Sequence, residues 1–89
     1  MKAIVTVIGK DTVGIIASVC VLLAEHNVNV LDISQTVMQD YFTMIMMVDL
    51  TDCTASFADL AASLDQSGQE RGLSIRIQRE DIFKAMHEI

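Results

Sequence analysis

The spacing of apolar residues in this chain follows the same order twice: a strand, a helix and then a strand. Strands are indicated where β-branched residues cluster or apolar and polar residues alternate, and helices where apolar residues recur every three to four positions. The expected elements, in chain order, are strand 2–9, helix 13–26, strand 28–38, strand 41–50, helix 56–70, strand 73–79 and a short amphipathic helix within 80–89. No proline interrupts this pattern, and no low-complexity segment separates its two halves.

With right-handed crossovers, this order predicts one fold class. It is an α+β, ferredoxin-like βαββαβ sandwich: a four-stranded antiparallel sheet with two helices on one face, followed by a short C-terminal helix. A chain of 89 residues has room for one hydrophobic core. The sequence therefore predicts a single domain over residues 1–89.

A two-residue turn at Gln39–Asp40 would fix the register of the central hairpin. Val37 would then face Phe42, and the same register would place Leu31 opposite Val48 and Asn29 opposite Leu50. The core expected beneath both helices is Ala3, Val5, Val7, Leu31, Ile33, Met44, Met46, Val48, Leu73, Ile75 and Ile77. The opposite face is expected to leave Ile4, Ile8, Ile45 and Met47 bare, unless the C-terminal helix or another copy covers them.

The chain is 52% hydrophobic, with a mean hydropathy of +0.43. This is more apolar material than a small monomer easily buries, so we expect a homodimer or a higher homo-oligomer. The formal charge of -6 argues against nucleic acid and against anionic membranes as partners. The sequence shows no membrane span and no signal peptide, which leads us to expect a soluble, cytoplasmic protein.

The side chains that most often carry catalysis have plain structural interpretations here. Cys20 lies on the inner stripe of the first helix, and Cys53 stands beside Asp52, which disfavours a reactive thiolate. His26 suits a helix C-terminus, and His87 lies on the polar side of the last helix. No CxxC, HExxH or other metal-binding spacing is present. We therefore expect no enzyme activity, no catalytic residues, no cofactor and no metal site.

Two features remain as candidates for ligand binding. Where the first strand meets the first helix, the backbone N–H groups of Gly14 and Ile15 and the helix dipole form an anion site. Asp11 stands beside this site and could accept an ammonium group. The second feature is Asn29, whose amide is expected on the apolar core face and can bond both a carboxylate and an amine. Each also has a structural interpretation: Asp11 as a helix cap, Gly14 as a packing residue and Asn29 as a loop-bonding amide.

A resemblance to the ACT-domain family, small ligand-sensing modules of amino-acid metabolism, lies in the segment GKDTVGIIASVCVLLAEHNVNVLDISQTV followed by YFTMIMMVDL. It covers nearly the whole chain. The chain most resembles stand-alone ACT proteins of bacteria and archaea that look like one half of the glycine-cleavage repressor. The family typically associates through strands or helices and binds its effector between copies, and the resemblance implies the same arrangement here.

The resemblance also assigns positions. The family's first loop has a polar residue, Arg, Pro, Gly and an aliphatic residue where this chain has Asp11, Thr12, Val13, Gly14 and Ile15. The family's Gly-Val-Asn-Ile at the second strand is matched by Asn27, Val28, Asn29 and Val30. Thr12 and Val13 thus depart from the Arg and Pro of the family, which removes a cation and a rigid helix start.

The resulting hypothesis is a non-catalytic regulatory homodimer that binds a small amino acid or a related metabolite. Its ligand-binding residues would be Asp11, Gly14, Ile15, Asn29 and Val30, with Asn29 contributed by the neighbouring copy. The alternative is an adaptor of ACT fold that binds another protein and no small molecule. In that case the protein partner would dock on Ile4, Ile8, Ile45 and Met47.

Overall fold

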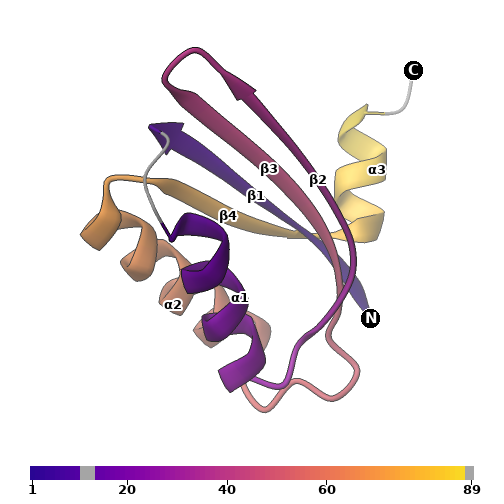
Figure 1. The fold of residues 1–89 in the computed structure, drawn as a ribbon. Helices are drawn as coiled ribbons and strands as arrows, with labels where there is room; N and C mark the ends of the chain where they lie inside the picture. The colour runs from indigo at the N-terminus through magenta and orange to yellow at the C-terminus, as the bar shows by residue number, and fades with distance from the viewer. Residues whose placement is uncertain (11–13, 88–89) are drawn as a thin grey trace.

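A computed structural model describes residues 1–10 and 14–87 (Figure 1). Within those residues the elements are β1 (Lys2–Lys10), α1 (Ile15–Glu25), β2 (Asn29–Met38), β3 (Tyr41–Asp49), α2 (Phe57–Arg71), β4 (Ser74–Arg79) and α3 (Glu80–His87). This is the predicted βαββαβ order followed by a short helix. The predicted role of Asp11 falls on a residue that lies outside the described ranges.

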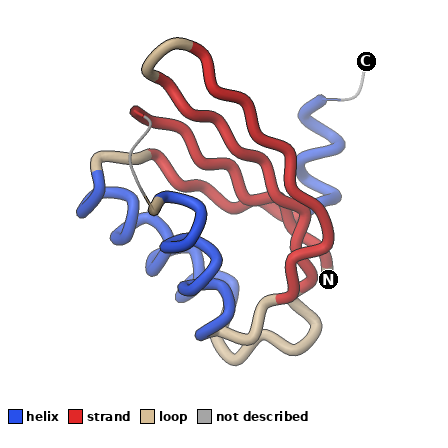
Figure 2. The backbone as a smooth tube through the Cα atoms, in the orientation of Figure 1, coloured by secondary structure: helices blue, strands red, loops and turns tan. Residues whose placement is uncertain are grey.

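The four strands form one antiparallel sheet in the order β2-β3-β1-β4. Strands β1 and β3 are therefore central, and β2 and β4 form the two edges. Helices α1 and α2 both lie against one side of the sheet, which we call the inner face (Figure 2). The predicted fold class is confirmed.

The core lies between the inner face and the two helices. The sheet supplies nine of the predicted residues, all buried: Ala3, Val5, Val7, Met44, Met46, Val48, Leu73, Ile75 and Ile77. Helix α1 adds Ile15, Val19 and Leu23, and helix α2 adds Leu60 and Leu64. Every buried side chain of β3 has an even number, which is the alternation expected of a strand with one face on the core.

Two of the predicted core residues are not in the core. Leu31 is 45% exposed and Ile33 is 41% exposed. Ile33 does point to the inner face, because it pairs with the buried Met46, but β2 is the edge strand and the helices leave it uncovered. Periodicity shows which face a side chain lies on, whereas burial also depends on what covers that face.

A β-bulge in β2 changes the predicted register. The pairing runs as expected from Met38–Tyr41 to Ile33–Met46. The register then shifts, so that Val30 pairs with Val48 and Leu31 is the extra residue. Asn29 therefore pairs with Asp49 rather than Leu50. Its predicted position on the core face is wrong, because one inserted residue moves everything beyond it to the other face.

The opposite side of the sheet, the outer face, is not entirely bare. The sequence predicts that Ile4 is bare unless the C-terminal helix or another copy covers it, and in the structure Ile4 is only 6% exposed and lies outside the core cluster. Helix α3 contacts both β1 and β4, and the amide of Gln78 on β4 donates to the sulfur of Met86 at 3.6 Å. The C-terminal helix thus covers part of the outer face, including Ile4.

The two long helices begin differently. Helix α2 has a side-chain cap, since Ser56 Oγ accepts from the backbone N–H of Asp59 at 3.1 Å. It ends at Gly72, which is left-handed with φ 71°. Helix α1 begins at Gly14, a residue with φ 86° that supplies no side-chain cap. Among the described residues, no side chain therefore caps the start of α1, whereas Ser56 satisfies one N–H group at the start of α2.

Candidate functional site

The N-terminus of α1 forms the first half of the candidate site. The carbonyl of Gly14 accepts from the backbone N–H of Ser18 at 2.9 Å and from Ser18 Oγ at 2.8 Å, which fixes the first turn. The first turn carries no acidic side chain that would neutralise the positive helix end. A Cβ atom on Gly14 would meet nothing within 4 Å, so the space beside its backbone is open. Ile15 is buried in the core and can offer a ligand only its backbone.

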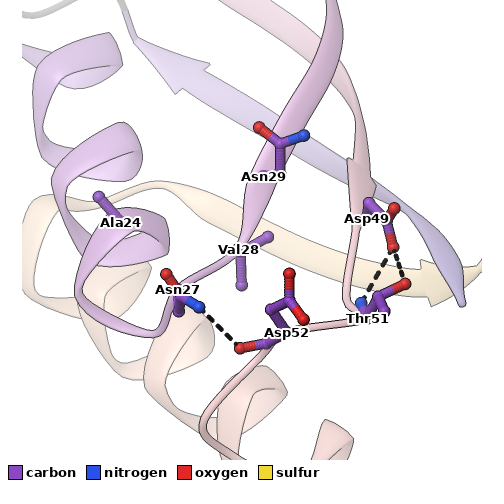
Figure 3. A pocket seen from close by; sticks show the side chains of 7 residues that line it. All are labelled: Ala24, Asn27, Val28, Asn29, Asp49, Thr51 and Asp52. Atoms are coloured by element: carbon purple, nitrogen blue, oxygen red, sulfur yellow. Dashed lines mark hydrogen bonds between the residues drawn. The ribbon is translucent and has the colours of Figure 1, made fainter.

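Asn29, at the start of β2, belongs to the second half of the site. It lines a pocket of about 290 Å³ together with Ala24, Asn27, Val28, Asp49, Thr51 and Asp52 (Figure 3). Asn27 is left-handed with φ 58° and donates from Nδ2 to the backbone carbonyl of Asp52 at 3.0 Å. The Asn29 side chain is exposed. Val30, the other predicted residue on this strand, is half-buried and packs against the core.

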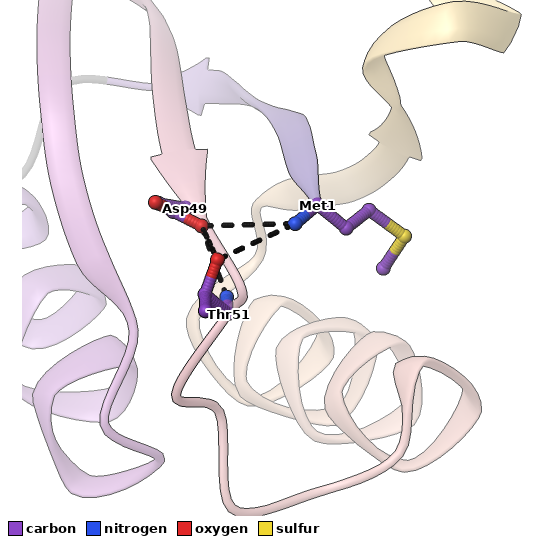
Figure 4. Close-up of polar contacts among 3 residues, drawn as sticks. All are labelled: Met1, Asp49 and Thr51. Atoms are coloured by element: carbon purple, nitrogen blue, oxygen red, sulfur yellow. Dashed lines mark hydrogen bonds and ion pairs between the residues drawn. The ribbon is translucent and has the colours of Figure 1, made fainter.

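Asp49 gives the pocket a fixed negative charge. Its Oδ1 accepts from Thr51 Oγ1 at 2.6 Å and from the Thr51 backbone N–H at 2.9 Å. The N-terminal ammonium of Met1 lies 3.8 Å from the same oxygen (Figure 4). The hydrogen bonds from Thr51 hold the pKa of Asp49 below its ordinary value of 3.8, with the positive charges of the N-terminus and Lys2 adding to the effect. The carboxylate is therefore ionised at neutral pH.

The two halves of the site lie at opposite ends of the sheet in a single chain. Strands β1 and β2 both run antiparallel to β3, so they point in the same direction. The end of β1, which leads toward Gly14, pairs with Tyr41 beside the hairpin turn. Asn29 lies at the other end, near Asp49, and the eleven residues of α1, about 16 Å of helix, separate it from Gly14. Of the predicted ligand-binding residues that the structure describes, Gly14 and Ile15 do not meet Asn29 and Val30 within one copy.

The side chains interpreted as structural have ordinary surroundings. Cys20 and Cys53 are free thiols that are half-buried against the core, and His26 Nδ1 lies 2.9 Å from the carbonyl of Leu22. Residues 1–10 and 14–87 contain no group of three His, Cys, Asp or Glu side chains arranged to hold a metal. None of the helices in the described part of the chain has the length and apolar character of a membrane span.

With this fold and these positions in place, comparison with known proteins shows the family. The model of the ACT domain matches residues 2–78, and the chain belongs to that family. A UPF0237 protein of Clostridium acetobutylicum is 56% identical over the full length of both chains. A UPF0237 protein of the archaeon Methanocaldococcus jannaschii is 48% identical over 99% of this chain and 98% of its own.

Solved structures agree with this assignment. An ACT domain protein from Streptococcus pneumoniae has a TM-score of 0.82 and 45% identity, and the match covers 98% of each chain. A putative glycine cleavage system transcriptional repressor has a TM-score of 0.73 at 20% identity and shares the fold over 86% of this chain and 44% of its own. The regulatory subunit of aspartate kinase from Thermus thermophilus matches with a TM-score of 0.66 and 25% identity, over 86% of this chain and 50% of its own.

The sequence interpretation located Gly14 and Ile15 at the start of α1 correctly, but it missed Asp49, Thr51 and Asp52 around Asn29. No motif in the sequence distinguishes Asp49 and Asp52 from ordinary solvated carboxylates at the end of a strand. The bulge at Leu31 is what brings Asn29 beside Asp49. No glycine, proline or other local signal marks that bulge in the sequence.

Proposed function

We propose that this protein is a non-catalytic regulatory module that binds a small amino acid or a related metabolite between two copies in the cytoplasm. Membership of the ACT family supports a regulatory role. The observation that carries the proposal is that Gly14 and Asn29 lie at opposite ends of α1 and of the sheet, because a site that uses both residues requires a second chain.

Strand β2 provides a means of bringing the two halves together. It is an edge strand, and nine of its ten residues are exposed. An exposed strand edge offers unpaired backbone groups to another strand. If two β2 strands pair antiparallel about a two-fold axis, Asn29 of one copy approaches the hairpin end of the other. The start of α1 lies at that end.

The same pairing would cover apolar side chains that the single chain leaves in water. Leu31, Ile33 and Val37 of β2 are exposed, and so are Ile16 and Val21 of α1. The apolar residues of α1 lie on more than one side of this helix. Within one copy its buried residues lie on a single stripe. A second copy beside β2 would supply the missing cover.

The ligand chemistry follows from the groups at each half. A carboxylate would accept from the N–H groups of Gly14 and Ile15, where the helix dipole favours an anion. Asp11 would hold the ammonium group, and Asn29 from the partner copy would bond to both ends, with the backbone of Val30 beside it. Charge-assisted hydrogen bonds of about 1.5–3 kcal/mol each, less the cost of association, correspond to roughly micromolar to millimolar affinity.

A thermal-shift panel of the twenty amino acids and common metabolites tests the proposal. A ligand present at a hundred times its Kd stabilises the fold by about 2.7 kcal/mol, which raises the Tm of a domain of this size by about 10 °C or more. We expect Asp11→Ala and Asn29→Ala to lose the shift. Gln66→Ala is the matched control, because Gln66 is an exposed carboxamide on α2 and is not among the residues that line the pocket of Asn29.

A flat panel on a folded protein would reject ligand binding and favour the adaptor alternative. A shift that persists in both Asp11→Ala and Asn29→Ala would keep the sensing role and reject this site. The two results are distinguishable because the first concerns the wild-type protein and the second concerns only the variants.

A further inference from the structure

The outer face of the sheet is a second surface that the β2 edge does not involve. Its central rows run across β1 and β3 through the pairs Ile8–Thr43, Thr6–Ile45 and Ile4–Met47. Helix α3 covers the end of this face that contains Ile4. The other end is open, with Ile8 47% exposed and Ile45 41% exposed. The outer face is thus divided into a covered half and an open half.

Helix α3 also carries apolar side chains that the described part of the chain leaves largely in water, although the sulfur of Met86 accepts from Gln78. Ile82 and Met86 are both exposed. They are four residues apart and therefore lie on the same side of the helix. The helix stands on the outer side of the sheet, away from α1 and α2 (Figure 1). One molecule therefore presents two largely exposed apolar surfaces, the open half of the outer face and the side of α3 that carries Ile82 and Met86.

Charge separates the outer side of the molecule from the helical layer. Helices α1 and α2, with the loop before α2, carry five carboxylates against one cation: Glu25, Asp52, Asp59, Asp65, Glu70 and Arg71. The described sheet, its hairpin turn and α3 carry equal numbers of each sign: Lys2, Lys10, Arg76, Arg79, Lys84, Asp32, Asp40, Asp49, Glu80 and Asp81. Two helical layers would repel each other, whereas the described residues of the sheet, its hairpin turn and α3 carry no net side-chain charge.

The charges on the outer side are also complementary. Lys10 and Arg76 lie at or beside the open half, since Lys10 pairs with Tyr41 and Arg76 with Thr6. Neither forms an ion pair within residues 1–10 and 14–87. The first turn of α3 is acidic, with Glu80 and Asp81, and Asp81 also pairs with Arg79 of its own chain at 3.2 Å. Cations beside the open half thus match carboxylates at the start of the helix that would cover it.

We infer that the outer face binds a second copy of this chain, with α3 of each copy packed between its own sheet and the open half of the partner's outer face. A two-fold axis that lies between the two sheets and runs perpendicular to their strands produces this arrangement. It places the covered half of each outer face opposite the open half of the other. Ile82 and Met86 then contact Ile8 and Ile45, and the acidic first turn approaches Lys10. The contact is isologous, so it closes after two copies.

This surface is separate from the β2 edge, and either contact can form without the other. If both form, the assembly is a tetramer of about 39 kDa, four chains of 9.8 kDa each. Light scattering coupled to size-exclusion chromatography measures this mass directly. We expect Ile45→Glu and Ile82→Glu each to halve it, because either one buries a carboxylate in the outer contact.

Ala62→Glu is the matched control, since it adds the same charge at an exposed position of α2, and it should leave the mass unchanged. Ile33→Lys, on the β2 edge, should also halve the mass, and its combination with Ile45→Glu should give a monomer. Circular dichroism and thermal unfolding of each variant verify that it is folded.

The outcomes separate the two contacts. If Ile45→Glu and Ile82→Glu both fold and keep the wild-type mass, the outer contact is wrong. If the wild type is a dimer that only these two variants dissociate, the outer contact stands and the β2 pairing is rejected. A wild-type monomer at all concentrations would overturn both.

Discussion

The two edge strands of the sheet, β4 and β2, differ in how completely one chain buries their apolar side chains. At the β4 side, the strand packs against α2, and Leu73, Ile75 and Ile77 are all buried. At the β2 side, nine of ten strand residues are exposed, although β2 is just as rich in Leu, Ile and Val. Composition is therefore similar on both sides, and the difference comes from what covers each edge. The β4 side is complete in one copy, whereas the β2 side has the features of an interface.

The largest expected effect comes from truncating one apolar side chain in the covered core and one on the uncovered β2 edge. Leu64→Ala removes a side chain with no exposed surface, and we expect it to lower the free energy of unfolding by about 2–5 kcal/mol. Ile33→Ala, on the uncovered edge, should cost about 1 kcal/mol or less in dilute protein. Urea unfolding with fluorescence or circular dichroism measures both values.

Repeating this measurement at high protein concentration sharpens the comparison. If β2 pairs with a second copy, the cost of Ile33→Ala should grow with concentration, while the cost of Leu64→Ala relative to wild type should change less. Equal losses for the two variants in dilute protein would mean that the β2 side is already covered within one chain.

A smaller effect on stability is expected at the two left-handed glycines, Gly72 on the β4 side and Gly14 at the start of α1. Gly72 ends α2 with φ 71° and Gly14 begins α1 with φ 86°, and a Cβ atom at either would meet nothing within 4 Å. Alanine at each position should therefore cost a similar amount, about 1–2 kcal/mol, from backbone strain alone. Only Gly14→Ala should also weaken the response to a ligand, because its methyl group occupies the open space beside the helix start.

Gly72→Ala serves as the control for strain in this pair. Thermal-shift titrations of both variants with a ligand found in the panel compare them directly. Equal ligand response in the two would place the ligand away from α1.

The smallest expected effect concerns Asp49, at the β2 side. Its pKa is lowered in the folded chain, so the folded state binds a proton less readily than the unfolded state does. The resulting stabilisation is present above the ordinary pKa of 3.8 and is lost as the pH falls through the lower folded value. The urea midpoint of the wild type should exceed that of Asp49→Asn near neutral pH, and the difference should shrink below about pH 4.

Thr51→Val serves as a second variant, since it removes the Thr51 Oγ1 hydrogen bond and keeps the carboxylate. It should reproduce part of the same pH dependence. Parallel pH profiles for the wild type and Asp49→Asn would contradict the lowered pKa.

Most of the fold could be predicted from the sequence because its information is local. Alternation placed Leu73, Ile75 and Ile77 correctly, and the two-residue turn fixed the hairpin register as far as Ile33. The bulge at Leu31 could not be predicted, because it depends on the fit of β2 to β3 and has no residue signature. The predicted burial of Leu31 and Ile33 was wrong for another reason. An apolar pattern does not indicate whether the same chain or another copy covers the side chains.

The candidate site was predictable to a similar degree. The loop-to-helix junction at Gly14 has a local signature, and the structure places it at a helix start. The face of Asn29 depended on a register that extended across the bulge, and it was wrong.

The bulge also determines where β2 can lose a residue without changing the faces of its other side chains. Val30 faces inward and Asp32 outward, opposite Val48 and Met47, which are themselves consecutive in β3. A chain lacking Leu31 would join these two neighbours in a regular ladder, and every remaining side chain would keep its present face. Loss of a residue elsewhere in β2 would instead move every side chain beyond the deletion to the opposite face of the sheet. Leu31 is thus a natural place for homologous chains to differ in length by one residue without rebuilding the hairpin.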